Sequence, residues 1–447
     1  MSMVVSEEGK LLILEDPSDE ELNRAREHNG PIIIVLRKLG SVNVQGKHPM
    51  NIYILKSPSD EELEALKAQL MARRTSTREV AIEGPISRRE LLIGRVVKVI
   101  EKNVPTYFEN ACSARFGCND CVNACPTNAT SIVNNRVVIN ENACIECGLC
   151  VSKCPTGALA MVGADDNEYV ALLNKLNDVK GIKRITFTCP LNTREPRNGE
   201  YIYRVPCVDA VSPEWVTMAL AKSLEVSIEC PDQSCKLGGA DYAKGLINAF
   251  MGSFKLGITK DDALSMATDE TLSERIIYMG IRRNDYVKAL VRLRPRSKGV
   301  TNELLKIFSI HIDDVKCSFC GVCFAKCPER AFDVGRDGNK TVLKFNSLKC
   351  IGCGHCARLC PEKAITINRA REFPMSDSTD VVYDEVVTCR MCGKPFDTRR
   401  HIMTMKIKLG IKGDPEWLYL CPDCRRYYTA KKMLENALGV KEVKSYV

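Results

Sequence analysis

The sequence has no apolar run long enough to cross a lipid bilayer, since none approaches the roughly 18 residues that a membrane-spanning helix needs. It also starts without the basic segment followed by an apolar one that marks a secretory signal. Disulfides belong mainly to secreted proteins, so we expect the thiols of this chain to be reduced. These absences favour a cytoplasmic protein with no membrane span of its own.

Motifs for nucleotide binding and radical chemistry are missing as well. The sequence contains no Gly-x-Gly-x-x-Gly dinucleotide loop, no phosphate loop ending in Gly-Lys-Ser/Thr, and no Cys-x3-Cys-x2-Cys triad. We therefore predict no catalytic residue, and the chain is not expected to carry out substrate chemistry by itself.

Cysteine, by contrast, is abundant, with 24 among 447 residues. Thiolates are ligands for zinc and for iron–sulfur clusters. The formal net charge is +8, but cysteines that bind metal are deprotonated. Six sites of four cysteines, at about −2 each, would bring the net charge to about −4. The apparent basicity is therefore no argument for a nucleic-acid partner.

Residues 1–85 contain no cysteine and are predicted to form a small α/β docking module. The segment PSDEEL occurs at 17–22 and again at 58–63, each time after a strand-like apolar run. Ser18 with Glu21, and Ser59 with Glu62, have the spacing of a capping box that begins a helix. The repeat predicts two strand–helix units.

Residues 86–178 are predicted to form a ferredoxin domain with two 4Fe-4S clusters. The run CIECGLCVSKCP has the C-x2-C-x2-C-x3-C-P spacing of bacterial-type ferredoxins, in which the fourth cysteine of one run binds the other cluster. The run CSARFGCNDCVNACP precedes it. Crossed ligation predicts one set of Cys112, Cys118, Cys121 and Cys154, and a second set of Cys144, Cys147, Cys150 and Cys125. Zinc sites are the alternative.

The first of these runs departs from the standard spacing, because five residues instead of two separate Cys112 from Cys118. Gly117 would help a longer loop to return Cys112 to the cluster. Otherwise the site would hold a three-iron cluster or a ligand from elsewhere. We expect a complete four-iron cluster.

Residues 297–375 repeat the design with standard spacing in both runs, CSFCGVCFAKCP and CIGCGHCARLCP. Crossed ligation predicts two further 4Fe-4S sites. Their ligands are Cys317, Cys320, Cys323 and Cys360 in one site, and Cys350, Cys353, Cys356 and Cys327 in the other.

Residues 376–447 are predicted to form a zinc-ribbon-like tail. Two C-x2-C pairs, separated by 28 residues, form a four-thiolate set of Cys389, Cys392, Cys421 and Cys424. Zinc is expected, with rubredoxin-like iron as the alternative. The tail also resembles the C-terminal extension of ferredoxin subunits in hydrogenase and formate-hydrogenlyase complexes, which implies a structural role.

Four cysteines remain, in residues 179–296: Cys189, Cys207, Cys230 and Cys235. The first three follow the strand-like runs RITFT, YIYRVP and EVSIE. Ligands gather at the carboxyl ends of the strands of an α/β sheet, so three strand ends could bring these thiols together. A helix is predicted over 212–224, with Ser212 as its cap and Pro213 at its first position. The alternative is a set of buried free cysteines.

The segment from Arg204 to Gly245, which contains Cys207 and the pair ECPDQSC, resembles the iron–sulfur delta subunit of methyl-viologen-reducing hydrogenase. That family couples hydrogenase or formate dehydrogenase to heterodisulfide reductase and binds a 2Fe-2S cluster. The resemblance implies that Cys207, Cys230 and Cys235 are cluster ligands, with Cys189 as the fourth. The family has a second cysteine shortly after the position of Cys189, and this chain lacks it, so the fourth ligand stays open.

The predicted fold class is therefore α+β and multidomain: the N-terminal module, two ferredoxin-like domains, a central α/β sheet domain and the zinc-ribbon-like tail. We expect an electron-transfer subunit that relays single electrons between a catalytic oxidoreductase partner and an acceptor. The catalytic partner would be a heterodisulfide-reductase-like subunit, a formate dehydrogenase or a hydrogenase. The alternatives are a free polyferredoxin shuttle and a nucleic-acid or assembly protein with structural clusters.

Overall fold

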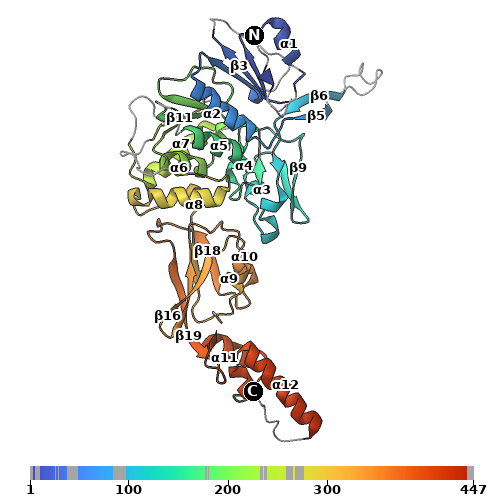
Figure 1. The fold of residues 1–447 in the computed structure, drawn as a ribbon, viewed down its shortest axis with the longest axis vertical. Coiled ribbons are helices and arrows are strands. Elements are labelled where there is room, and N and C mark those ends of the chain that lie inside the picture. Colours follow the sequence, from blue (N-terminus) through green and yellow to red (C-terminus); the bar gives the residue numbers. More distant parts are fainter. Residues whose placement is uncertain are drawn as a thin grey trace. The chain divides into compact units, whose positions relative to one another are not determined.

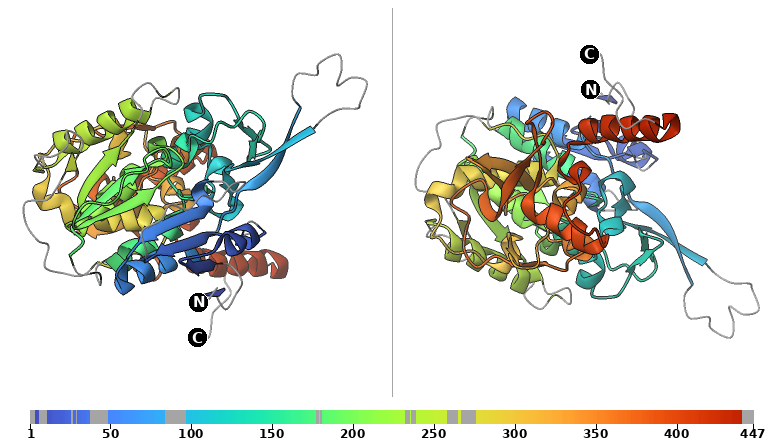
Figure 2. Two further views of the ribbon diagram at one scale, coloured as in Figure 1. Left: turned by 90° about the horizontal axis from the view of Figure 1, so that it is seen from above. Right: turned by 90° about the horizontal axis from the view of Figure 1, so that it is seen from below.

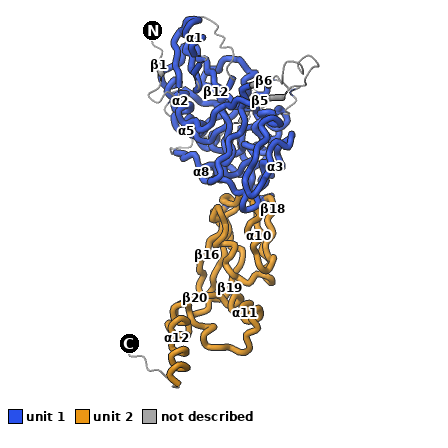
Figure 3. The backbone as a smooth tube through the Cα atoms, turned by 90° about the vertical axis from the view of Figure 1, so that its right-hand side faces the viewer, with its two compact units in different colours: residues 1–307, 370–375 blue, residues 308–369, 376–447 orange. Residues whose placement is uncertain are grey.

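The computed structural model describes residues 4–5, 11–25, 27–28, 30–37, 49–83, 97–176, 179, 181–231, 235, 239–257, 265–266 and 276–439. The chain divides into two compact units (Figure 3). Unit 1 comprises residues 1–307 and 370–375, and unit 2 comprises residues 308–369 and 376–447. The five-part division of the sequence stays a prediction, but its first three parts all lie in unit 1.

The N-terminal part of unit 1 is a four-stranded sheet (Figure 1). Strands β2 (Leu12–Glu15), β3 (Ile32–Leu36) and β4 (Ile52–Lys56) are parallel, and β1 (Val4–Val5) is antiparallel to β2. Helices α1 (Asp19–Ala25) and α2 (Asp60–Met71) begin at the two copies of PSDEEL. Both predicted capping boxes are confirmed: the Ser18 and Ser59 backbone N–H groups donate to Glu21 and Glu62 at 2.8 and 2.9 Å.

The first cysteine-rich part follows a hairpin of β5 (Arg78–Glu83) and β6 (Val97–Lys102). Strand β7 (Thr106–Tyr107) pairs with β10 (Leu159–Ala160), and β8 (Thr130–Val133) pairs with β9 (Arg136–Ile139). Two helices of five residues, α3 (Asp120–Ala124) and α4 (Leu149–Lys153), carry cysteines. Each of these short helices contains the third cysteine of its run and ends just before the fourth.

The central sheet of unit 1 has the order β12–β11–β13–β14. Strands β11 (Arg184–Thr188), β12 (Glu200–Arg204) and β13 (Glu225–Glu229) are parallel, and β14 (Ser265–Met266) is antiparallel. Helices lie on both sides of the sheet (Figure 2), namely α5 (Asp166–Leu176), α6 (Pro213–Ala221), α7 (Gly239–Ser253) and α8 (Arg282–Leu293). The three predicted strands and the helix cap at Ser212 are confirmed, since the Trp215 N–H donates to Ser212 Oγ at 3.2 Å.

Four aromatic rings form the centre of this domain. Tyr169 of α5 stacks on Trp215 of α6, with 4.5 Å between ring centroids. It also contacts Tyr203 of the sheet edge-on and Phe187 at a tilt of 45°. Every residue of α6 is buried, including the polar Glu214 and Thr217. The helix therefore packs between the sheet and α8, and this could not be read from its own periodicity.

Unit 2 contains a second cysteine-rich part and the tail. Strand β15 (Phe308–Ile312) pairs with β18 (Ile365–Arg369), and helices α9 (Val322–Lys326) and α10 (His355–Leu359) carry cysteines. A four-stranded antiparallel sheet joins the hairpin of β16 (Phe332–Asp337) and β17 (Lys340–Phe345) to β19 (Thr379–Thr388) and β20 (Pro395–Thr398) of the tail. Helices α11 (Arg399–Lys408) and α12 (Pro422–Leu438) complete the tail.

Within the part of the chain that the structure describes, no helix is both long enough and apolar enough to span a membrane.

Candidate iron–sulfur and metal sites

Unit 2 contains two cavities that are each lined by four cysteines. In both cavities three cysteines come from one run and the fourth from the other run, as crossed ligation predicts. One cavity is lined by Cys317, Cys320, Cys323 and Cys360, and the other by Cys350, Cys353, Cys356 and Cys327. Apolar side chains such as Ile312, Leu343 and Ile367 form much of the remaining walls.

The turns that shape these cavities depend on glycine. Gly321 and Gly354 precede α9 and α10 with φ of +74° and +70°, a region that side chains with a Cβ rarely adopt. At the other end of each helix Cys327 and Cys360 are extended, and a proline follows. The backbone N–H groups of Ala331 and Ala364 donate to these two sulfurs, each at 3.3 Å.

Unit 1 contains an equivalent cavity, lined by Cys125, Cys144, Cys147 and Cys150. The thiols of the other predicted set also lie near one another. Burial raises the pKa of the Cys121 thiol to about 12, and the charges of Cys154 and Cys112 add to the effect. Burial also raises the pKa of the Cys118 thiol to about 12, and the charges of Cys154 and Cys121 add to the effect.

The longer loop after Cys112 does return this cysteine to the others. Two single turns of 3-10 helix, η3 (Glu109–Ala111) and η4 (Ala114–Phe116), flank Cys112 and take up the extra residues. Gly117 closes the second turn with φ of +87°. Tyr107, on β7, is hydrogen-bonded to the Cys112 side chain, and the Ala114 N–H donates to its sulfur at 3.4 Å.

Burial raises the pKa of most of these thiols. It brings Cys323 and Cys356 to about 12, with neighbouring cysteine charges adding to the effect, and it raises Cys150 well above the usual range. Four thiolates in one apolar cavity repel one another, so they deprotonate together only when a cation balances their charge. The donor set therefore fits an iron–sulfur cluster better than a group of free thiols.

The two cysteine-rich parts differ in the residue that follows each Cys-Pro pair. In unit 1 it is threonine: the hydroxyl groups of Thr127 and Thr156 lie 3.7 Å from the sulfurs of Cys125 and Cys154. Burial raises the pKa of Cys125, but hydrogen bonds from Thr127 and nearby N–H groups outweigh it and lower the pKa. In unit 2 the equivalent residues are Glu329 and Glu362, which line the two cavities.

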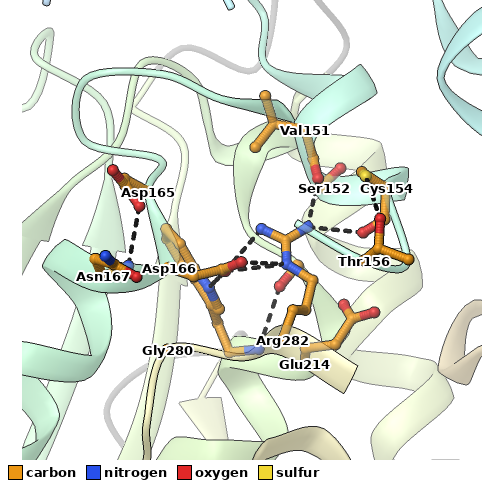
Figure 4. Close-up of polar contacts among 12 residues, drawn as sticks. Val151, Ser152, Cys154, Thr156, Asp165, Asp166, Asn167, Glu214, Gly280 and Arg282 are labelled. Carbon is orange, nitrogen blue, oxygen red and sulfur yellow. Dashed lines mark hydrogen bonds and ion pairs between the residues drawn. The ribbon is translucent and has the colours of Figure 1, made fainter. Parts of the chain in front are cut away.

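A buried guanidinium holds the end of helix α4 next to Cys154 (Figure 4). Arg282 Nη1 donates to the carbonyl oxygens of Val151 and Cys154 at 2.6 and 2.8 Å. Its other nitrogens pair with Asp166, to which the Trp215 indole also donates, at 2.7 Å. Arg282 is 2% exposed, so this cation is part of the core of unit 1.

A second buried cation lies at the same helix end. Lys306 Nζ donates to the Ser152 carbonyl at 2.7 Å and pairs with Glu214 of α6 at 2.8 Å. Burial lowers the pKa of Lys306, and Glu214 opposes that effect. Sequence reasoning predicted neither cation, because Arg282 and Lys306 lie more than 120 residues from their partners in α4 and match no motif.

Three of the four central cysteines come together at the carboxyl ends of the parallel strands. Burial raises the pKa of the Cys207 thiol to about 12, and Cys189 and Cys235 are close enough to contribute. Cys189 and Cys207 are buried, whereas Cys230 and Cys235 are half-buried. Residues 232–234 and 236–238 lie outside the described residues. Of the segment ECPDQSC, the structure therefore describes Glu229, Cys230, Pro231 and Cys235.

The four tail cysteines form the tightest group among the described residues. The sulfurs of Cys389, Cys392, Cys421 and Cys424 all lie within 4.8 Å of one another. Cys421 is the N-cap of α12, and α11 lies in the 28-residue interval between the two cysteine pairs. Burial raises the pKa of Cys389, but N–H groups of Cys421, Cys392 and Met391 outweigh it and lower the pKa to about 6. A compact four-thiolate set suits a tetrahedral metal ion.

Comparison with known families identifies two segments of the chain. Residues 114–158 match one family described as a 4Fe-4S dicluster domain, and residues 309–361 match another with the same description. The first match begins after Cys112, the cysteine with the unusual spacing, and the second contains all eight cysteines of its part. No curated protein matches the chain. The chain thus contains two ferredoxin-type 4Fe-4S dicluster domains, which supports a role in iron–sulfur electron transfer.

Proposed function

We propose that the protein is an electron-transfer subunit of a multi-subunit oxidoreductase complex. It would relay single electrons between a catalytic partner and an acceptor through four 4Fe-4S clusters and one 2Fe-2S cluster. The observation that carries this proposal is the pair of dicluster domains in one chain. The partner we propose is a heterodisulfide-reductase-like, formate dehydrogenase or hydrogenase catalytic subunit, on the basis of the resemblance of the central domain.

Iron–sulfur clusters supply one-electron transfer when bound, and protein residues set their potentials. In this chain the cysteine sets described above would hold the four cubane clusters. Backbone N–H groups and the hydroxyls of Thr127 and Thr156 would donate to ligand sulfurs, while the apolar walls would exclude water. The residues thus bind, space and tune the clusters.

The extra parts of the chain favour a subunit of a complex over a free shuttle. A soluble shuttle needs only its ferredoxin domains, whereas this chain adds an N-terminal α/β sheet, a central α/β domain and a tail. We assign the N-terminal sheet and the tail to docking and stability. A nucleic-acid or assembly role for structural clusters is the other candidate, and reversible reduction distinguishes it.

For the central domain we propose a 2Fe-2S cluster with Cys207, Cys230 and Cys235 as ligands and Cys189 as the fourth. The support is the grouping of Cys207 with Cys189 and Cys235 at the ends of parallel strands. For the tail we propose zinc, with rubredoxin-like iron as the alternative, because four sulfurs lie within 4.8 Å of one another. That site would stabilise the tail without carrying electrons.

Iron and sulfide analysis of anaerobically purified protein tests the cluster assignment. We expect about 18 irons per chain, which is four clusters of four irons plus one of two. A Cys230→Ser, Cys235→Ser variant should fall to about 16 irons and lose a 2Fe-2S spectrum. A Cys392→Ser, Cys424→Ser variant is the matched control, because it should lose one zinc and keep all the iron. An unchanged iron content in the first variant would refute the central cluster.

A further inference from the structure

The segment Cys207–Ala210 lies between two of the cysteine sites in unit 1. Cys207 belongs to the central group, and the next three residues form a single 3-10 turn, η5 (Val208–Ala210), which is fully buried. The far end of this turn contacts the loop that begins helix α4. That loop contains Cys147 and Gly148, and its cysteines line the cavity with Cys125, Cys144 and Cys150.

The contact between Gly148 and Ala210 is as close as two backbones allow. A Cβ placed on Gly148 would lie 2.5 Å from the Cβ of Ala210 and 3.2 Å from its Cα. Contacts of this length do not occur in folded proteins, so only glycine permits the approach. The backbone that carries Cys147 therefore lies directly against the backbone that follows Cys207.

The other side of the segment is packed equally closely. A Cβ on Gly239, at the start of α7, would lie 3.1 Å from the Cys207 sulfur and 2.7 Å from Val208 Cγ2. The start of helix α7 thus packs closely against Cys207 and Val208.

Asp209, the middle residue of this turn, is buried as well, at 3% exposed. The other site of the first dicluster domain is placed differently, since Cys154 has Arg282 and Lys306 at its helix end.

We propose that Cys207–Ala210 is the electron junction of unit 1, joining the central cysteine site to the site of Cys125, Cys144, Cys147 and Cys150. This inference rests on the proposed function. One electron leaves one centre and enters the other, and no bond or proton moves. Because tunnelling slows steeply with distance, the central site exchanges electrons with this dicluster site faster than with the site of Cys112, Cys118, Cys121 and Cys154.

Paramagnetic relaxation in the full-length protein tests the junction. In a sample reduced with dithionite, a nearby reduced 4Fe-4S cluster speeds the electron-spin relaxation of the 2Fe-2S signal. We expect this enhancement to be lost in Cys144→Ala, Cys147→Ala protein, which lacks the adjacent cluster. It should persist in the matched Cys118→Ala, Cys121→Ala variant, with iron analysis confirming one missing cluster in each.

A glycine pair tests the contact without removing a cluster. Gly148→Ala forces the two backbones apart, and Gly321→Ala is its control, since Gly321 holds the same motif position with the same φ of +74° but has nothing within 4 Å of its added Cβ. We expect Gly148→Ala to weaken the enhancement and Gly321→Ala to leave it unchanged.

The outcomes separate this inference from the proposed function. A 2Fe-2S signal whose relaxation depends on the Cys118 and Cys121 cluster, or on neither, would overturn the junction and leave the five-cluster assignment standing. Absence of any 2Fe-2S signal in the unaltered protein would refute the central cluster, and the junction with it.

Discussion

The two dicluster domains share one cysteine motif but lie in different surroundings. In unit 1, helix α4, which contains the third cysteine of its run, is largely buried: Cys150, Val151 and Ser152 are covered, and two cations bind its carbonyl end. In unit 2 no residue of α9 is buried, and in α10 only Cys356 is. The shared motif therefore does not determine the surroundings of the cysteines, which differ in burial and in the charges nearby.

From this difference we infer that the two dicluster domains have different roles in electron transfer. Partly exposed ligands, such as those of unit 2, suit exchange with an external partner, because a partner's cofactor can approach closely. The buried cysteines around α4, next to the central domain, suit transfer within the chain. Solvent exposure and hydrogen bonds to sulfur also shift cluster potentials.

The largest predicted effect comes from the buried cation of unit 1. Arg282→Met leaves Asp166 buried without its partner and should destabilise unit 1 by about 3 to 5 kcal/mol. The matched control is Arg399→Met in unit 2, whose ion pair with Glu385 is exposed and should matter little. Hydrogen exchange of α5 and of β17 in both variants measures the two units separately. Equal loss of protection in the two units of the Arg282 variant would contradict the account.

A smaller effect should follow from the threonines of unit 1. Thr127→Val and Thr156→Val each remove a hydroxyl beside a ligand sulfur. The loss of a hydrogen bond worth about 0.5 to 1.5 kcal/mol corresponds to about 20 to 60 mV for one electron. We expect the potential of one unit 1 cluster to fall by that amount in each variant, as measured by redox titration followed by EPR. The potentials of the unit 2 clusters should not change in either variant.

In unit 2 we predict a rise in cluster potential, and a smaller change than in unit 1, because the site is more solvated. Glu329→Gln removes a carboxylate from the wall of one cavity and should raise the potential of that cluster. Glu362→Gln likewise removes a carboxylate from the wall of the other cavity and should raise the potential of that cluster. If both substitutions lowered the cluster potentials in the same titration, this prediction would be wrong.

The sequence predicts the local features of this molecule well. Both capping boxes, the three parallel strands that precede Cys189, Cys207 and Cys230, and the dicluster domains follow from short patterns whose physics is local. The ligand sets themselves stay predictions, although the cavities group the cysteines in the same way.

Long-range packing was not predictable from single segments. Arg282 and Lys306 meet the α4 carbonyls across more than 120 residues, and Gly148 meets Ala210 through the packing of two domains. The pairing of β17 with β19, which joins the tail to the second dicluster domain, was not predicted either. Strand β19 carries charged and apolar residues without a clean alternation. These contacts depend on tertiary structure and leave no periodic signal.

The central claim is that the clusters carry electrons. Coulometric titration of the anaerobic protein, with the absorbance of the clusters followed during reduction and reoxidation, tests it most directly. We expect reversible uptake of about five electrons per chain, one for each proposed cluster. Full iron content with no reversible uptake at potentials reached by dithionite would contradict it and would mean that the clusters are structural.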